Sequence, residues 1–383
     1  MKNYVDYGVG DSDKEFAKKS VRFAKSGLKS LKLFSLVAIS SFVAVASLTG
    51  CSNGDQSSSS SLSGQFAGSG ASSQSSAVDV WRAGFQAKNA SASITYDGKG
   101  SGGGRKDLID GAVLFAGTDV ALTDDEVKKA ENGACKGGGV VEVPVYISPI
   151  AIVYNLDDVK DLKLTPVTVA KIFDGAITKW NDAEIKAENP DASLPDKAIT
   201  PVHRSDQSGT TENFTDYLAK TTDGIWKHPA SGSWPNNVGQ SGQGTSGLIN
   251  VVQQSSGTIG YADASKVGKL STVAIKVGDK FVKYSAEGAA KLVEDSPYGS
   301  SEGRYVVELN RKVTDPKYYP LVLVSYQATC TVHKDSKSAD FVRSWLTYIT
   351  SDEAQKKAAE EAGSAPISES IRERIKKSIE TIK

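Results

Sequence analysis

The chain has 383 residues, and its 45 basic and 45 acidic side chains give a formal net charge of zero at pH 7. This balance argues against a nucleic-acid-binding protein, which usually carries a basic excess, but it leaves room for a small anion, which needs only a few well-placed donors. The apolar fraction of 39% is ordinary for a soluble protein, and the length allows roughly two compact domains.

The first 50 residues have the pattern of a secretion signal. Basic residues between Lys18 and Lys32 precede an uncharged run, 33–50, that ends in small side chains. The run stops at Cys51, and residues 48–51 (LTGC) resemble the lipobox of bacterial lipoproteins, in which the cysteine is lipidated and begins the mature chain. A single membrane-spanning helix is the alternative, because the run is just long enough. We expect lipidation at Cys51 and a lipid anchor on the extracytoplasmic face of the cell membrane.

Residues 51–64 (CSNGDQSSSSSLSG) have nothing to bury and are predicted to form a flexible tether. A folded head would then begin at residue 65, held just off the membrane.

Within the head, short apolar runs alternate with helical patterns, which predicts an α/β fold. Strands are predicted at 93–98 (SITYDG), 112–117 (AVLFAG), 142–155 (EVPVYISPIAIVYN, interrupted by Pro149), 198–204 (AITPVHR), 257–262 (GTIGYA) and 320–333 (PLVLVSYQATCTVH). Apolar residues at helical spacing predict core-facing helices around Val78, Trp81 and Phe85, around Phe214, Tyr217 and Leu218, and around Ile371, Ile375, Ile379 and Ile382.

Ser/Gly-rich turns stand directly before a helical pattern three times, at 68–73 (GSGASS), 100–104 (GSGGG) and 208–210 (SGT). The first amide groups of a helix lack intrahelical partners, and the helix dipole favours negative charge there. Glycine lets the backbone approach a ligand closely, and Ser or Thr adds a hydroxyl donor. One such turn usually only caps its helix, but three in one chain favour an oxyanion site.

Two charged residues precede the third turn. Arg204 offers a planar pair of donors suited to phosphate, and we expect Asp206 to hold that guanidinium in place. Alone, the pair could be a surface ion pair.

From about residue 63 to the C-terminus the sequence resembles the high-affinity phosphate-binding proteins of ABC-type phosphate importers, the PstS family. The marks, in family order, are GSGASS (68–73), YDGKGSGGG (96–104), AGTD (116–119) and HRSDQSGT (203–210), with weaker ones at 171–182 (KIFDGAITKWND) and 255–261 (SSGTIGY). The resemblance implies a two-lobed periplasmic-binding-protein-like (type II) fold with a hinge and a central ligand cleft. It implies a receptor for inorganic phosphate that works without cofactor, metal or catalysis.

The resemblance also implies which residues bind phosphate. Carried over by position, they are Ser72, Ser73, Ser101, Asp119, Arg204, Ser208, Gly209 and Thr210, with Asp206 in support. Ser73 departs from the family, where many relatives carry an aromatic residue, and only its backbone N–H is expected to touch phosphate.

A carboxylate facing an anion, as Asp119 would, needs a reason. Phosphate near neutral pH keeps at least one proton, which an ionised carboxylate can accept, whereas sulfate has none to give. A site built around a hydrogen bond can reject an analogue that lacks it by about 10⁴–10⁵. We therefore expect Asp119 to set the preference for phosphate over sulfate, and arsenate, which is also protonated, to bind to some degree.

The resemblance implies a first lobe of 65–146 plus 320–383 and a second lobe of 147–319, so that phosphate bridges two lobes that close around it. We expect a monomer that delivers phosphate to an ABC permease in the membrane. Once Cys51 is set aside, Cys135 and Cys330 remain, and outside the membrane such a pair is usually a disulfide. Two unrelated buried thiols are the alternative.

Three other functions compete with this interpretation. Residues 98–103 fit the G-x-G-x-x-G pattern of dinucleotide-binding proteins, and Asp119 follows at about the right distance. A secreted phosphatase-like hydrolase would bind phosphate as product, but the three histidines show no metal-ligand spacing. A cell-surface adhesin could keep the fold and bind another protein.

Overall fold

The computed structural model describes residues 62–301 and 303–383, all of which belong to one compact unit of the chain. The predicted signal segment, the lipidation site Cys51 and the tether up to residue 61 lie outside the described residues. Within the described part, no helix combines the length and the apolar character needed to cross a membrane.

The described chain begins with three parallel strands joined by helices. β1 (Gly64–Gly70) lies between β2 (Ala92–Asp97) and β3 (Phe115–Thr118) and runs parallel to both. The connections are α1 (Ser75–Lys88), which follows a 3₁₀ turn, and α2 (Ser101–Ile109). Because the three strands run in the same direction, their carboxyl ends lie at one edge of the sheet. The first two Ser/Gly-rich turns and Asp119 follow the strands at that edge.

Two long antiparallel strands connect this part to the rest of the sheet. β14 (Val322–Cys330) pairs with β3 and, up to Pro149, with β4 (Val140–Asn155). From Ile150 onward β4 pairs with β8 (Thr258–Asp263) instead. The interruption predicted at Pro149 is wrong, because β4 runs straight through it. Proline lacks an N–H to donate, and it stands here at the position where β4 changes partner.

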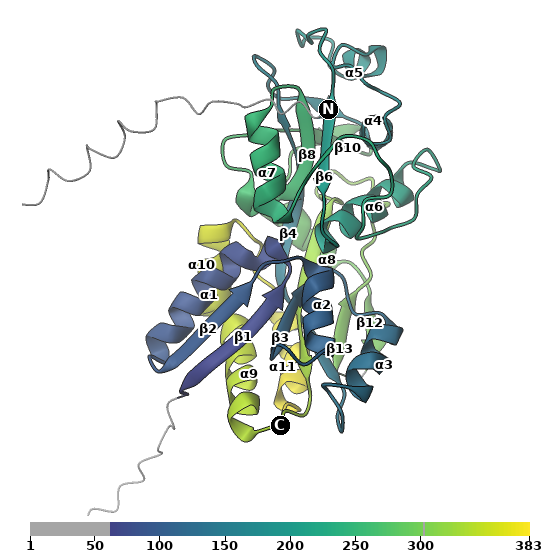
Figure 1. Ribbon diagram of the computed structural model, residues 1–383. Helices are drawn as coiled ribbons and strands as arrows, with labels where there is room; N and C mark the ends of the chain where they lie inside the picture. Colours follow the sequence, from purple (N-terminus) through teal and green to yellow (C-terminus); the bar gives the residue numbers. More distant parts are fainter. Residues whose placement is uncertain (1–61, 302) are drawn as a thin grey trace, which may run out of the picture. The chain divides into compact units, whose positions relative to one another are not determined.

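Parallel strands continue the sheet beyond β8. β6 (Thr200–Arg204) is parallel to β8 and to β7 (Gln240–Gly242). The helices α6 (Gly209–Thr221) and α7 (Gly244–Gln254) follow β6 and β7 directly. In Figure 1, β4 runs from the group of ribbons around β1, β2 and β3 to the group around β6, β8 and α7.

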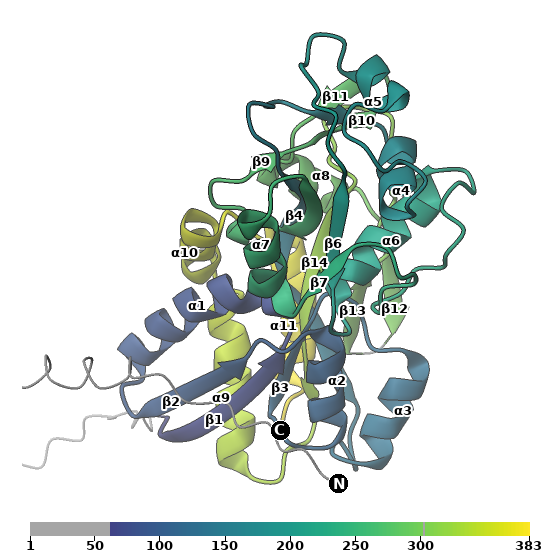
Figure 2. The same ribbon diagram turned by 45° about the horizontal axis from the view of Figure 1, so that its top comes forward.

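Shorter elements surround these strands. They are α4 (Pro166–Phe173), α5 (Ala183–Glu188), α8 (Ala286–Glu294), β9 (Ser271–Thr272) on β4, and a small sheet of β5 (Lys163–Leu164), β10 (Ala274–Val277) and β11 (Lys280–Val282). Figure 2 shows β10, β11 and α5 together, away from the labelled helices α2 and α3 (Asp124–Asn132).

The structure contains a hairpin whose strands were not predicted from the sequence. β12 (Tyr298–Ser301) and β13 (Arg304–Val307) form an antiparallel pair, and Arg304 of β13 pairs with Glu142 in the first half of β4. These residues lie inside the segment predicted for the second lobe, yet they extend the part of the sheet that contains β3 and β14.

The C-terminal helices complete the core beside β1 and β14. They are α9 (Ser336–Ile349), α10 (Asp352–Ala362) and α11 (Glu369–Glu380). Phe341 of α9 stacks on Phe66 of β1 with ring centroids 3.8 Å apart, and Trp81 of α1 donates from Nε1 to the carbonyl of Ala354 in α10. The predicted apolar stripe of α11 is buried at Ile371, Ile375 and Ile379. A disulfide joins Cys135, after α3, to Cys330 at the end of β14.

Candidate functional site

The three Ser/Gly-rich turns meet in one buried cluster at the ends of β1, β2, β3 and β6. Each of the eight predicted phosphate-binding residues is buried there, and none of the seven with side-chain donors or acceptors is more than 8% exposed. Buried polar groups on this scale must be satisfied by one another or by a ligand. Most groups of the cluster are hydrogen-bond donors, and they meet the carboxylates of Asp119 and Asp206.

The first turn leaves β1 and forms a short 3₁₀ helix, Ser72–Gln74, before α1 begins. The Ser72 hydroxyl lies 3.0 Å from that of Thr245 and accepts a hydrogen bond from the Thr245 amide at the start of α7. The Ser73 hydroxyl donates to Oδ1 of Asp119 over 2.6 Å. The sequence interpretation gave Ser73 a backbone role alone, so this side-chain contact is additional.

The second turn starts α2 at Ser101, whose hydroxyl accepts from the backbone N–H of Asp119 at 3.1 Å. The preceding Gly100 has φ of 104°, and a Cβ there would lie 2.3 Å from Oδ2 of Asp206. Glycine is thus required by both conformation and space. This turn brings α2 directly against the end of β6, which carries Arg204, and the loop after it, which carries Asp206.

The third turn starts α6. The Ser208 hydroxyl accepts from the Thr211 amide at 3.1 Å and so caps the helix, as the plain interpretation of such a turn would have it. A Cβ on Gly209 would lie 2.5 Å from the Ser101 hydroxyl and 2.7 Å from the Asp119 Cβ, so only glycine permits this approach. The Thr210 hydroxyl donates to Oδ2 of Asp119 at 2.9 Å.

Arg204 is held by Asp206, as the sequence predicts. Its Nε and Nη2 donate hydrogen bonds to the Asp206 carboxylate at 2.8 and 2.5 Å. Nη1 makes no such bond among the described residues, so it can donate to a ligand oxygen. The amide of Gly244 also donates to Asp206 at 2.9 Å. Burial alone would raise the pKa of Asp206, but the hydrogen bonds and charge of Arg204 outweigh it and lower that pKa.

Asp119 sits at the end of β3 and receives hydroxyl donors from three directions. Ser73 and Ser325 donate to Oδ1, and Thr210 donates to Oδ2. Burial raises the pKa of this carboxyl above its ordinary value, and the three hydroxyls and the charge of Arg204 oppose the shift without cancelling it. The pKa of Asp119 is therefore raised, whereas the pKa of Asp206 is lowered.

Several residues of the site were missed by the sequence interpretation. Gly244 and Thr245 lie in a fourth Ser/Gly-rich turn before a helix, residues 241–246 (SGQGTS), and that same pattern could have found them. Ser325 lies in the middle of β14 and gives no local signal. Neither does Asn213, whose side-chain amide donates to the carbonyl of Asp119 at 2.8 Å.

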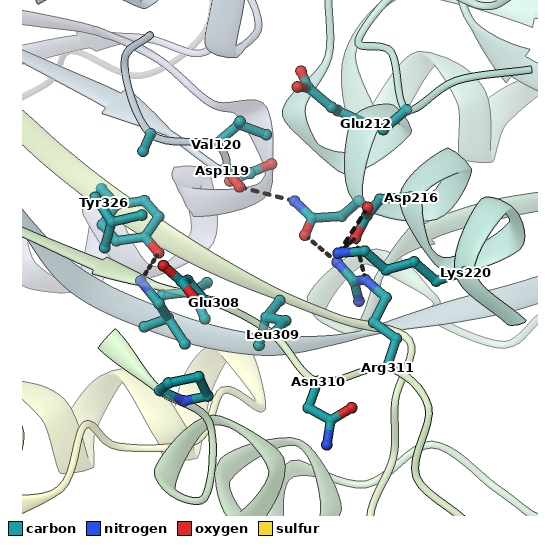
Figure 3. A pocket seen from close by; sticks show the side chains of 17 residues that line it. Asp119, Val120, Glu212, Asp216, Lys220, Glu308, Leu309, Asn310, Arg311 and Tyr326 are labelled. Atoms are coloured by element: carbon teal, nitrogen blue, oxygen red, sulfur yellow. Dashed lines mark hydrogen bonds and ion pairs between the residues drawn. The ribbon is translucent and has the colours of Figure 1, made fainter. Parts of the chain in front are cut away.

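Asn213 also connects the cluster to a buried arginine. Its Oδ1 accepts from Nη2 of Arg311 at 2.6 Å, and Arg311 further donates to Asp216 and to the carbonyls of Pro320 and Val322. Figure 3 shows Arg311 reaching Asp216 in a pocket that Asp119, Glu212, Glu308 and Tyr326 also line. The start of β14 is thus linked through Arg311 and Asn213 to the backbone of Asp119.

The competing sequence patterns do not form their sites here. In the G-x-G-x-x-G segment, Gly102 donates to the carbonyl of Gln207, and a Cβ there would lie 2.3 Å from the Gln207 side chain, so the turn is covered by protein. Across residues 62–301 and 303–383, no group of His, Cys, Asp and Glu is arranged to hold a metal ion.

The fold and this donor-lined cluster define a binding protein, and comparison with known proteins gives the family. A family model described as "PBP superfamily domain" matches residues 55–353. The chain is 31% identical over 285 residues to phosphate-binding protein PstS 3 of Mycobacterium tuberculosis, which covers 73% of this chain and 76% of that protein. It is 28% identical over 379 residues to phosphate-binding protein PstS 2 of the same organism, covering 94% and 100%.

Solved structures agree on the fold. A phosphate-binding protein from Stenotrophomonas maltophilia superimposes with a TM-score of 0.63 at 19% identity, covering 82% of this chain and 94% of that one. A putative phosphate transporter substrate-binding protein with bound phosphate from Clostridium perfringens gives 0.57 at 20% identity, covering 78% and 98%. The fold is the two-lobed type II periplasmic-binding-protein fold. The chain belongs to the PstS family of phosphate-binding proteins, a family of receptors rather than enzymes.

Proposed function

We propose that this chain is an extracytoplasmic receptor that binds one inorganic phosphate and delivers it to an ABC-type importer. The observation that carries the proposal is the cluster itself: three Ser/Gly-rich turns from separate parts of the chain meet one buried arginine and one buried carboxylate. Backbone amides at helix starts, hydroxyls and a guanidinium are the donors that phosphate recognition uses. The membership of the chain in the PstS family supports the same ligand.

Each predicted residue has a role in this proposal. Ser72 and Ser101 offer hydroxyl and amide, and Ser73 offers its amide. The start of α6 offers the amides of Ser208, Gly209 and Thr210 and the hydroxyls of Ser208 and Thr210. Arg204 presents Nη1, while Asp206 fixes the other side of the guanidinium. Asp119 accepts the proton that phosphate carries. For this, the Thr210 hydroxyl, which donates to Oδ2 of Asp119, turns toward a phosphate oxygen.

We further propose that the two lobes divide where β4 changes partner. Residues 65–149, the β12–β13 hairpin and 320–383 form the first lobe, because β4 pairs with β14 and β13 there. Residues 150–296 form the second. The chain returns to the second lobe before residue 319, whose amide donates to the Gly288 carbonyl in α8. It therefore crosses between the lobes at 149–150, on either side of the β12–β13 hairpin and near 320. Phosphate lies between Asp119 on one side and Arg204 with α6 on the other. Closure is driven by contacts that exist only when both lobes meet the ligand.

The anchor belongs to this proposal too. Lipidation at Cys51 would hold a monomeric receptor on the outer face of the membrane beside the permease, with the residues between Cys51 and the start of β1 at Gly64 as tether. Labelling the expressed full chain with a radioactive fatty acid tests this, with Cys51→Ser as the control that must lose the label. A full chain without label contradicts the anchor and leaves phosphate binding untouched.

Isothermal titration calorimetry on the non-lipidated chain 52–383 tests the ligand. The protein is first stripped of phosphate by unfolding and refolding with its disulfide intact. We expect tight one-to-one binding of phosphate and no heat with sulfate at neutral pH. Heat with neither anion would mean that the turns only cap their helices, and the proposal would be abandoned.

A further inference from the structure

Residues beside the proposed phosphate site donate hydrogen bonds to Asp119, the carboxylate proposed to accept the ligand's proton. We propose that Gln74, Ser325 and the hydroxyl of Ser73 are positioning residues that hold Oδ1 of Asp119 as a double acceptor, so that only Oδ2 exchanges a proton with the ligand. They thereby set the pH below which the site begins to accept sulfate. The inference rests on the proposed function and adds residues to it that do not touch phosphate themselves, apart from the Ser73 amide.

The direction of the hydrogen bonds follows from the partners. Nε2 of Gln74 donates to the Tyr326 carbonyl at 2.8 Å and to the Ser325 hydroxyl at 2.6 Å. A carbonyl can only accept, so the orientation of the Gln74 amide is fixed with its nitrogen on this side. The Ser325 oxygen therefore accepts from Gln74, and its single hydrogen is left for Oδ1 of Asp119, 2.5 Å away.

Oδ1 receives a second hydrogen from Ser73 at 2.6 Å. An oxygen that accepts two hydroxyl hydrogens is a poor place for a proton of its own. Any proton on Asp119 must then sit on Oδ2, the oxygen that faces Thr210 at the start of α6. Gln74, Ser73, Ser325 and Asp119 are all at most 4% exposed, so water does not compete for these bonds.

This arrangement makes the two anions behave differently with pH. Phosphate brings the proton that lies between its oxygen and Oδ2, and it binds when Asp119 is ionised. Sulfate brings none, so it needs Asp119 already protonated on Oδ2. Hydrogen bonds from Ser73 and Ser325 stabilise the ionised form and lower the pKa of Asp119, against the burial that raises it. They therefore lower the pH at which Asp119 becomes protonated and sulfate can bind.

Other charged and titratable groups around Asp119 lie outside this set of hydrogen bonds, which joins Gln74, Ser325 and Ser73 to Oδ1 and is called the Oδ1 relay below. Arg204 favours the ionised carboxylate, and the Asp119 charge acts on the buried Tyr96 and Asp263. On the side of the pocket in Figure 3 the neighbours are Glu212, Asp216, Lys220, Glu308 and Arg311. Because the variants below keep all of these groups, a change in the pH profile reports on the Oδ1 relay.

The test is a pH series of sulfate and phosphate titrations on the phosphate-free chain 52–383, comparing the parent with Ser325→Ala. We expect sulfate binding to appear at a pH about one unit higher in the variant, since the loss of a hydrogen bond to a charged acceptor is worth about that much. Phosphate binding at pH 8 should weaken by less than about tenfold. Gln74→Leu, which frees the Ser325 hydrogen to rotate, should shift the sulfate profile in the same direction by less.

The matched control is Thr329→Val on the same strand. Thr329 is equally buried, and its hydroxyl donates to the Leu114 carbonyl at 2.7 Å, away from Asp119. Its sulfate profile should coincide with that of the parent. If Ser325→Ala binds phosphate at pH 8 but its sulfate profile matches the parent, or stays silent throughout the folded range, the Oδ1 relay has no such role. A parent that binds no phosphate would instead overturn the proposed function.

Discussion

The buried cluster contains two carboxylates in two different settings. Asp206 faces the guanidinium of Arg204 and the amide of Gly244, and its pKa is lowered. Asp119 is surrounded by neutral hydroxyls, and burial raises its pKa. Asp206 therefore keeps its negative charge beside Arg204 to lower pH, whereas Asp119 takes up a proton more readily. In the proposed site, the same residue type either supports a cation or accepts the ligand's proton, according to whether its partners carry charge.

The sharpest way to break this comparison is Asp119→Asn. The neutral amide of asparagine is too weakly basic to take a proton from phosphate. The substitution also removes the negative charge that repels sulfate. We expect the preference for phosphate over sulfate to fall from about 10⁴ or more to within about tenfold, measured by titration of both anions and of arsenate. Arsenate should follow phosphate in parent and variant, because it carries the same kind of proton. An Asn variant that still rejects sulfate as the parent does would remove Asp119 from this role.

On the other side of the comparison, Arg204→Met leaves Asp206 buried without its partner. Breaking a buried ion pair by removing one member typically costs about 3–5 kcal/mol, and the ligand also loses its only cationic donor among the predicted residues. We expect phosphate binding to be lost at micromolar concentrations and the urea midpoint to fall. Arg82→Met, at an exposed pair with Asp79, is the control and should change neither. Retained tight binding in Arg204→Met would show that the guanidinium does not face the ligand.

The opposite pKa shifts predict opposite pH dependences of stability in the ligand-free protein. Asp206, with its lowered pKa, stabilises the fold above its ordinary pKa of 3.8, and this contribution is lost as the pH falls through the lower, folded value. Asp119, with its raised pKa, favours the fold below 3.8, and that contribution is lost as the pH rises through the higher, folded value.

Urea unfolding of Asp206→Asn and Asp119→Asn between pH 3.5 and 7 measures this contrast. Relative to its own effect at pH 3.5, Asp206→Asn should become more destabilising toward pH 7. Asp119→Asn should become less destabilising, or stabilising, over the same range. Parallel curves for the two variants would show that their environments do not differ as described.

The smallest effect is expected at Asn213, which touches the Asp119 backbone rather than the ligand. Asn213→Ala removes that hydrogen bond and one partner of Arg311. A loss of about 1 kcal/mol, or roughly fivefold in phosphate affinity, is expected if the bond forms on closure. Thr215→Val serves as the control, since its hydroxyl bonds only to backbone carbonyls of α6 and of Ser231 and to the Ser231 amide. If the Asn213 and Thr215 variants have equal phosphate affinities, the hydrogen bonds of Asn213 to Asp119 and Arg311 do not contribute to ligand binding.

The sequence predicted features that depend on neighbouring residues and missed features that depend on contacts between distant segments. Strand-to-helix turns are local, so Ser101 and Gly209 could be recognised from glycine and hydroxyl residues beside an apolar run. Ser325 could not, because nothing near it in the chain marks it, and it reaches Asp119 only through the antiparallel pairing of β14 with β3. The β12–β13 hairpin escaped for the same reason, since its place depends on a single pairing with β4.

The disulfide between Cys135 and Cys330 closes a ring with a sequence separation of 195 residues. That ring contains all of α6, β6, β8 and the other elements from β4 to β13. A protease that cuts once anywhere inside it therefore leaves a single covalent molecule, and only a reducing agent would part the two pieces. A receptor exposed to proteases outside the cell would keep both parts of its binding site in one molecule after such a cut.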